Sequence, residues 1–148
     1  MYAMILMMVD QENARVALDL QRAGLSATRQ RRALMSALRA SAHPQSVESL
    51  VKVLGTKMNP TTVYRALDQL IEVRLARRVD LGKNYALFES MEHHHHHLVC
   101  RSCGRVEDVS ACLPPSVSKK ILLAIPHFVS IEDHALEFFG ICKTCAKK

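Results

Sequence analysis

The sequence predicts an α+β fold built from two domains, and three observations support this. Helical periodicity of apolar residues covers most of the first 72 residues and then gives way to two short β-like runs. The basic charge lies in the same region, because residues 1–88 carry 13 Lys/Arg against 7 Asp/Glu while residues 89–148 carry 7 of each. All 5 cysteines follow residue 99. We therefore expect a basic domain at 1–88, a hinge at 89–92 and a metal-binding domain at 93–148.

Four helices are expected in the first domain, each delimited by capping residues. The first covers Glu12–Ala23 and ends at Gly24. The N-caps expected for the next three helices are Ser26 or Thr28, Ser46 and Asn59. Pro60 follows Asn59 at the first helical position. The helix that it opens carries its apolar residues on one face, at Val63, Ala66, Leu67, Leu70 and Ile71.

A β-hairpin is expected directly after these helices. Its strands would cover Leu75–Leu81 and Asn84–Phe88, with the turn at Gly82-Lys83. Helices followed by a hairpin form a winged helix-turn-helix, whose second helix enters the major groove of DNA. We therefore expect the basic domain to bind DNA, with phosphate contacts from the hairpin at Arg77, Arg78 and Lys83.

The second domain is expected to be small and to mix strands with a helix. Residues 93–100 alternate like a strand, Pro114 and Pro115 open a helix through about Ile125, and His127–Cys142 predicts a strand, a turn and a strand. Such a small module often needs a metal or a partner subunit for stability.

Two Cys-x-x-Cys pairs give the strongest chemical signal in the chain. The four thiolates at Cys100, Cys103, Cys142 and Cys145 can share one tetrahedral zinc ion, and Gly104 permits the tight turn after the first pair. Four sulfur ligands leave no open position, so this Zn²⁺ would be structural. Disulfides are the alternative, and release of zinc would allow a redox role. Cys112 stands outside both pairs and is expected to be a small hydrophobic side chain.

Five consecutive histidines at 93–97 give a second metal signal. In a strand, alternation places His95 and His97 on one face and His94 and His96 on the other. One strand would then serve two metal sites. The partners that we expect are His43 and Asp108 on the first face, and His134 on the second. Imidazole and carboxylate ligands suit Fe²⁺, Mn²⁺ or Zn²⁺.

Targeting signals are not expected. The apolar stretch at 1–9 is too short to span a bilayer and has no signal-peptide pattern, so we expect a cytoplasmic protein without membrane contact.

Two other classes of protein compete with a DNA-binding regulator. A zinc-dependent metallohydrolase would need an open metal position and a general base, and no His-Glu-x-x-His motif is present. A metal-storage protein would leave residues 28–88 without a role.

Several motifs together resemble the ferric uptake regulator (Fur) family. The motifs are Thr62-Val63-Tyr64-Arg65-x-Leu67-x-x-Leu70, the following hairpin, His94–His97 running into Cys100-x-x-Cys103-Gly104, and Gly140-x-Cys142-x-x-Cys145. Their order and spacing cover the chain from about Thr28 to Cys145. The resemblance implies a metal-responsive transcription regulator, generally a repressor and not an enzyme. It would be a homodimer of winged helices joined by hinges to α/β dimerisation domains, with an A/T-rich palindromic double-stranded operator.

The resemblance also implies a role for each candidate site residue. The four paired cysteines would hold structural zinc, and the regulatory metal would bind His43, His95, His97 and Asp108. Its usual further carboxylate is absent after Tyr85, so either Glu89 or Glu92 would substitute or the site would have four ligands. An additional metal would bind His94, His96 and His134, without the helix glutamate expected near 113–115. The residues expected to contact DNA are Arg29, Thr61, Thr62, Tyr64, Arg65, Arg77 and Lys83.

The residue at position 108 bears on the type of sensor. In the peroxide-sensing members that this chain resembles, an aspartate at this position accompanies iron-catalysed oxidation of a ligand histidine, here His43 or His95. The resemblance is therefore compatible with control of either metal homeostasis or a peroxide response.

Overall fold

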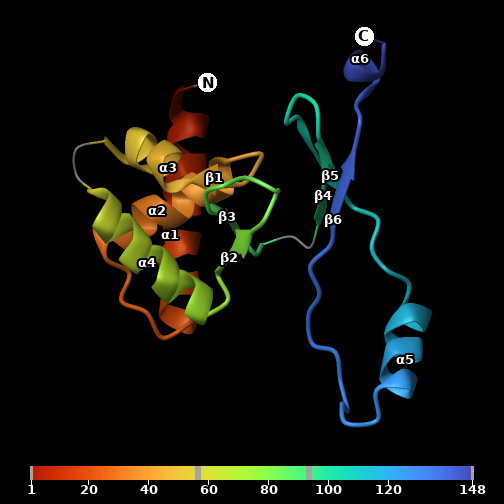
Figure 1. Cartoon of the computed structure of the whole chain (residues 1–148). Helices are drawn as coiled ribbons and strands as arrows, with labels where there is room; N and C mark the ends of the chain where they lie inside the picture. The colour runs from red at the N-terminus through yellow and green to blue at the C-terminus, as the bar shows by residue number, and fades with distance from the viewer. Residues whose placement is uncertain (1, 56–57, 93–94, 148) are drawn as a thin grey trace. The chain divides into compact units, whose positions relative to one another are not determined.

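The computed structural model describes residues 2–55, 58–92 and 95–147 (Figure 1). The chain divides into two compact units, residues 1–93 and residues 94–148, and each is described by itself. The α+β fold class is confirmed, with four helices leading the first unit and a three-stranded sheet at the centre of the second. The domain boundaries expected at 88 and 93 and the hinge at 89–92 stay predictions.

The first helix, α1 (Tyr2–Arg22), begins well before the predicted start at Glu12. It ends at Gly24, whose φ of 79° lies in the left-handed region that glycine adopts without strain. Within residues 2–55, 58–92 and 95–147, none of the helices has the length and apolar character needed to cross a membrane.

The next three helices begin at caps that the sequence predicted. Helix α2 (Arg29–Ala40) has Thr28 as its N-cap, α3 (Val47–Leu54) has Ser46, and α4 (Pro60–Glu72) has Asn59. The cap oxygens accept hydrogen bonds of 3.3, 3.1 and 2.8 Å from the backbone N–H three residues ahead. Between α2 and α4, Arg31 donates 2.8 and 3.1 Å hydrogen bonds to the side-chain oxygen of Gln69. This contact links α2 to α4 on the exposed side of the unit.

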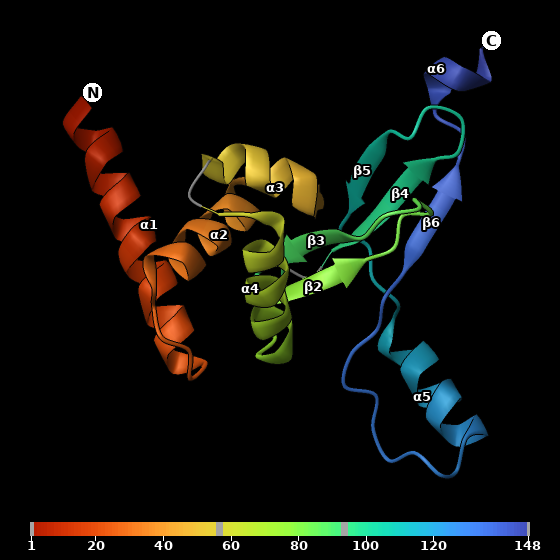
Figure 2. The same cartoon turned by 60° about the vertical axis from the view of Figure 1, so that its left-hand side comes forward.

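The wing is a three-stranded antiparallel sheet in the order β1-β3-β2. Strands β2 (Ala76–Val79) and β3 (Leu87–Ser90) form the predicted hairpin, and Figure 2 shows them beside α4. The additional strand β1 (Gln45–Ser46) was not expected from the sequence, because two residues are too few to give a β pattern. Strand β3 continues through Ser90, so Glu89 lies in the wing sheet opposite Arg77.

The apolar core of the first unit lies where the four helices meet the wing. Its fully buried members include Val16, Leu20, Leu34, Leu38, Leu50, Leu67 and Leu70. Four of the five apolar residues predicted on α4 are buried, and Ile71 is partly buried. Burial of this stripe leaves the opposite face of α4 exposed, which is the face available to a ligand.

One arginine joins the first helix to the rest of the unit. Arg39 on α2 is largely buried and forms ion pairs with Glu12 and Asp19 of α1, at 3.2 and 2.5 Å. A third carboxylate, that of Glu92, lies 3.4 Å from Arg39 Nε and also pairs with Arg15. The end of the unit is therefore held against α1 and α2 by charge.

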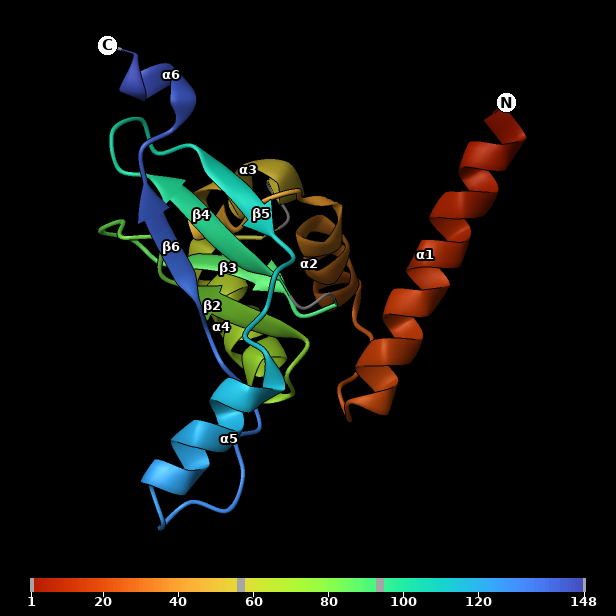
Figure 3. The same ribbon diagram turned by 90° about the vertical axis from the view of Figure 1, so that its right-hand side faces the viewer.

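The second unit is a sheet in the order β5-β4-β6 with two helices (Figure 3). The central strand β4 (His96–Cys100) pairs antiparallel with β5 (Val106–Val109) and parallel with β6 (Glu137–Gly140). Helix α5 (Pro115–Ala124) and the short α6 (Lys143–Ala146) lie at opposite ends of the sheet.

The prediction of two strands in His127–Cys142 is half wrong, because only β6 forms there. Residues 127–136 run as a loop in which Phe128 and Val129 project outward, Val129 being 97% exposed. The alternating pattern is present in this segment, yet no neighbouring strand of the described residues offers it hydrogen bonds. A β pattern predicts a strand only where a partner strand exists.

Leu34→Ala should destabilise the first unit by about 2–5 kcal/mol, because it opens a cavity in a core that cannot fully collapse. The control is Val53→Ala at a position that is 72% exposed, where a change within about 0.5 kcal/mol is expected. Urea unfolding of both variants measures the two free energies. Equal losses of unfolding free energy in the two variants would contradict the placement of Leu34 in this core.

Candidate metal centres

The pairing of β4 with β6 brings the two Cys-x-x-Cys pairs together. Because β4 and β6 are parallel and Cys100 lies opposite Gly140, the segments that follow the two strands leave the sheet at the same end. Cys103 then lies in the turn towards β5, while Cys142 caps α6 and Cys145 lies inside that helix. The turn closes at Gly104, which has a φ of 73° and donates a 2.8 Å hydrogen bond to the carbonyl of Cys100. Gly104 was predicted to permit the tight turn after the first cysteine pair, and its left-handed backbone is the conformation that makes this turn possible.

The four sulfur atoms fit one tetrahedral ion. All of them lie within 4.8 Å of one another, and Cys103 Sγ lies 3.8 Å from Cys142 Sγ. A zinc ion with Zn–S bonds of about 2.3 Å has sulfur atoms about 3.8 Å apart at the corners of its tetrahedron. The cluster therefore has the size, the ligand type and the ligand number of a structural zinc site. Bound zinc would cross-link the ends of two strands.

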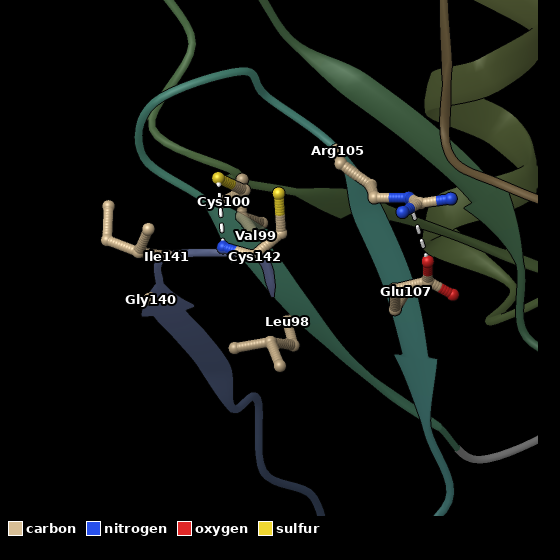
Figure 4. A pocket seen from close by; sticks show the side chains of 8 residues that line it. All are labelled: Leu98, Val99, Cys100, Arg105, Glu107, Gly140, Ile141 and Cys142. Carbon is tan, nitrogen blue, oxygen red and sulfur yellow. Dashed lines mark hydrogen bonds and ion pairs between the residues drawn. The ribbon is translucent and has the colours of Figure 1, made fainter. Parts of the chain in front are cut away.

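Backbone amides prepare two of these cysteines for metal. The N–H of Cys142 donates a 3.3 Å hydrogen bond to Cys100 Sγ (Figure 4), and together with the backbone N–H groups of Cys103 and Ser102 it lowers the pKa of that thiol to about 6. The pKa of Cys142 is also lowered, chiefly by the backbone N–H of Cys145. Since a thiolate rather than a thiol is the ligand, these hydrogen bonds favour the form that binds zinc.

Three of the residues predicted for the regulatory metal lie at the start of β4 and on the neighbouring strand β5. The rings of His95 and His97 lie 5.0 Å apart, and His97 is opposite Asp108 in the β4–β5 pair. The distance from His97 Nε2 to Asp108 Oδ1 is 3.9 Å. Two imidazoles and a carboxylate of the second unit therefore lie close together.

The remaining predicted ligands of that metal belong to the first unit. His43 is exposed and lies between α2 and β1. Glu89 accepts two 2.6 Å contacts from the Arg77 guanidinium, and Glu92 pairs with Arg15 and Arg39. Either carboxylate would have to share its charge between an arginine and a metal.

The face of β4 opposite His97 gathers a different set. His96 and His134 have ring centroids 5.1 Å apart, and Cys112 Sγ lies 3.1 Å from His134 Nε2. The third predicted residue, His94, lies outside the described residues. Cys112 was not predicted as a ligand, and its position just before the segment that lacks the expected helix glutamate was the available signal.

The predicted DNA contacts lie on α4, at the start of α2 and on the wing. Thr61, Tyr64 and Arg65 are exposed on α4, Thr62 is partly exposed, and Arg29 is the exposed first residue of α2. A groove of about 470 Å³ between α4 and the wing is lined by Tyr64, Arg78 and Lys83 among others. Tyr64 also packs edge-to-face on Phe88 of β3, with ring centroids 6.4 Å apart. Arg77 is engaged with Glu89, so its contact with DNA stays a prediction.

Cys103→Ser should reduce the zinc that survives dialysis against a chelator from one ion per chain to well below one, because only three thiolates remain. Thr144→Ala is the control, since Thr144 is exposed between Cys142 and Cys145. Elemental analysis measures the zinc content of both variants, and thermal unfolding measures their stability. Full zinc retention in Cys103→Ser would contradict the four-sulfur site.

Comparisons with known proteins agree with this architecture. The sequence profile of the ferric uptake regulator family matches residues 22–139. The chain is 36% identical over 133 residues to the ferric uptake regulation protein of Legionella pneumophila, covering 86% of this chain and 96% of that protein. It is 33% identical over 130 residues to that of Yersinia pestis, covering 84% and 86%. The crystal structure of the Vibrio cholerae ferric uptake regulator superimposes with a TM-score of 0.66 at 30% identity, covering 85% of this chain and 98% of that one. The chain therefore belongs to the ferric uptake regulator family, whose members are metal-responsive transcription regulators and not enzymes.

Proposed function

We propose that this chain is a cytoplasmic homodimeric repressor that binds an A/T-rich palindromic operator when its regulatory metal is present. It would control genes of metal homeostasis or of a peroxide response. The observation that carries the proposal is the group of His95, His97 and Asp108 in a chain that also has a winged helix. A metal-sensing group and a DNA-reading group in one chain can be coupled by a conformational equilibrium that both ligands bias.

The regulatory metal would be held by His43, His95, His97 and Asp108, with Glu89 or Glu92 as a further ligand. These residues come from both parts of the chain, so a bound ion would restrict the motion of one part against the other. A restricted dimer offers two recognition helices at a fixed spacing, as successive major grooves require. Imidazole and carboxylate ligands accept Fe²⁺, Mn²⁺ or Zn²⁺, and they exchange metal more readily than four thiolates.

Exposed apolar residues of the second unit support the homodimer. They include Leu123, Phe128, Val129, Phe138 and Ile141. Residues 95–147 contain only Val99 and Cys100 as buried apolar residues, so the unit alone has little core. A second copy that covers these side chains would supply the missing burial. The dimer would also match the two-fold symmetry of a palindromic operator.

Structural zinc would be held by Cys100, Cys103, Cys142 and Cys145. Contacts with DNA would come from Arg29, Thr61, Thr62, Tyr64, Arg65, Arg77 and Lys83. The positive dipole ends at the N-termini of α2 and α4 would add phosphate contacts.

His97→Ala should abolish the metal dependence of DNA binding while the tightly held zinc remains at one ion per chain. The measurement is a fluorescence anisotropy titration of DNA from upstream of the chain's own gene, at fixed salt because affinity depends steeply on salt. It is run with chelator and then with Fe²⁺, Mn²⁺ and Zn²⁺ separately. His127→Ala is the matched control, because His127 is exposed and lies in none of the metal clusters of the described residues. Metal-dependent binding by His97→Ala equal to wild type would contradict the proposed regulatory site.

Arg65→Ala should weaken operator binding by about 1–3 kcal/mol, which is about 5- to 150-fold. The control is Arg105→Ala, which removes an equal charge from an exposed arginine of the second unit that pairs with Glu107 at 3.0 Å. If both variants weaken binding equally, net charge rather than the α4 surface would account for affinity. Selection of binding sites from random DNA with metal present then tests whether the operator is A/T-rich and palindromic.

A further inference from the structure

Three potential metal ligands from three separate segments of the second unit converge at one point. His96 is the first residue of β4, Cys112 lies between β5 and α5, and His134 lies in the loop between α5 and β6. One ligand atom from each lies within 4.8 Å of the others. The closest pair is Cys112 Sγ and His134 Nε2, 3.1 Å apart. Such a convergence of imidazole nitrogens and a sulfur is the ligand set of a zinc site.

We propose that His96, Cys112 and His134 bind Zn²⁺ through two imidazoles and one thiolate. The inference builds on the additional site of His94, His96 and His134, and it makes Cys112 the ligand that supplies negative charge. A water molecule would take the fourth position of the tetrahedron. Binding replaces the thiol proton of Cys112, and this proton passes to solvent.

Cys112 changes the metal that this site would select. A site of histidines and carboxylates accepts Fe²⁺ or Mn²⁺, whereas a thiolate favours Zn²⁺ over both. The group formed by His95, His97 and Asp108 contains no sulfur. The two faces of β4 would therefore carry sites of different chemistry, one suited to an exchanging regulatory ion and the other to zinc.

The local fold gives such an ion a structural task. Residues 110–114 and 125–136 have no helix or strand, and they lead into α5 and out of it. Within this loop, the backbone N–H of His134 donates a 2.8 Å hydrogen bond to the Asp133 carboxylate. An ion shared by Cys112, His134 and His96 would tie both connections of α5 to the central strand. Loop closure of this kind restricts segments that have little apolar burial of their own.

The count of cysteines makes a direct test possible. The chain has 5 cysteines, and four of them form the Cys100–Cys103–Cys142–Cys145 cluster. While that cluster keeps its zinc, Cys112 is the one thiol left to bind an added ion. A sulfur-to-metal charge-transfer band from added Co²⁺ therefore reports Cys112 bound to the ion.

The experiment titrates Co²⁺ into the full-length, reduced protein after chelator has removed weakly held metal, with zinc content measured in the same samples. We expect a thiolate-to-cobalt band and the visible bands of tetrahedral cobalt while zinc stays at one ion per chain. Cys112→Ser should lose the charge-transfer band and bind Co²⁺ at least about tenfold more weakly, since even outer-shell changes cost about 10- to 100-fold. Excess Zn²⁺ should bleach the band, and excess Mn²⁺ should leave it.

Two variants complete the test. His134→Ala should weaken the band as Cys112→Ser does, whereas His127→Ala in the same loop should leave it unchanged. A wild-type protein with no charge-transfer band, or a band that persists in Cys112→Ser with zinc retained, would overturn the proposal.

DNA binding, measured on the same preparations, distinguishes a failure of the proposed function from a failure of the Cys112 site. Metal-independent DNA binding by the wild type would contradict the proposed function, whatever the cobalt spectra show. Loss of the cobalt band alone in Cys112→Ser, with metal-dependent DNA binding intact, supports the Cys112 site and separates it from the regulatory metal.

Discussion

We propose that a zinc tie between two strand ends, made by four cysteines, is the constraint on which the second unit depends. Strands β4 and β6 are parallel, and their common end carries Cys100 on one and Cys142 just after the other. Apolar burial cannot replace this tie, because Val99 and Cys100 are the only buried apolar residues of 95–147. Structural zinc contributes folding free energy of about 10–16 kcal/mol in small zinc modules, which is far more than two buried side chains supply.

The position of β4 links the four-cysteine cluster to the histidines predicted to bind the other metals. The strand begins at His96 and ends at Cys100, so the predicted ligands His96 and His97 lie within one strand length of the four-sulfur cluster. Its alternation separates His96 from His95 and His97. Pairing with β5 then brings Asp108 to His97, and the loop before β6 brings His134 to His96. If β4 lost its register, all of these groups would separate together.

The sequence predicted well those features that are decided locally. The caps at Thr28, Ser46 and Asn59 follow from side-chain hydrogen bonds that span three residues. The two cysteine pairs carry their own spacing, and the histidine alternation needs only a strand. In each case the physical cause lies within a few residues, where a single sequence can show it.

The features that the sequence missed depend on distant segments. Strand β1 exists because β3 offers it hydrogen bonds, and the strand expected within 127–136 is absent because no described strand lies beside it. The approach of Cys112 to His134 depends on the path of the chain around α5. The ion pairs of Glu89 with Arg77 and of Glu92 with Arg39 likewise join residues far apart in the chain. Long-range contacts of this kind leave no periodic pattern.

Hydrogen exchange of the full-length reduced protein, before and after removal of its zinc, tests the dependence of the second unit on the four-cysteine tie most directly. The account predicts that amides of β4, β5 and β6 lose protection when zinc leaves, while those of α2 and α4 keep it, because the first unit has its own apolar core. Restored zinc should restore the protection. Protection of β4 that survives complete removal of zinc would contradict the account.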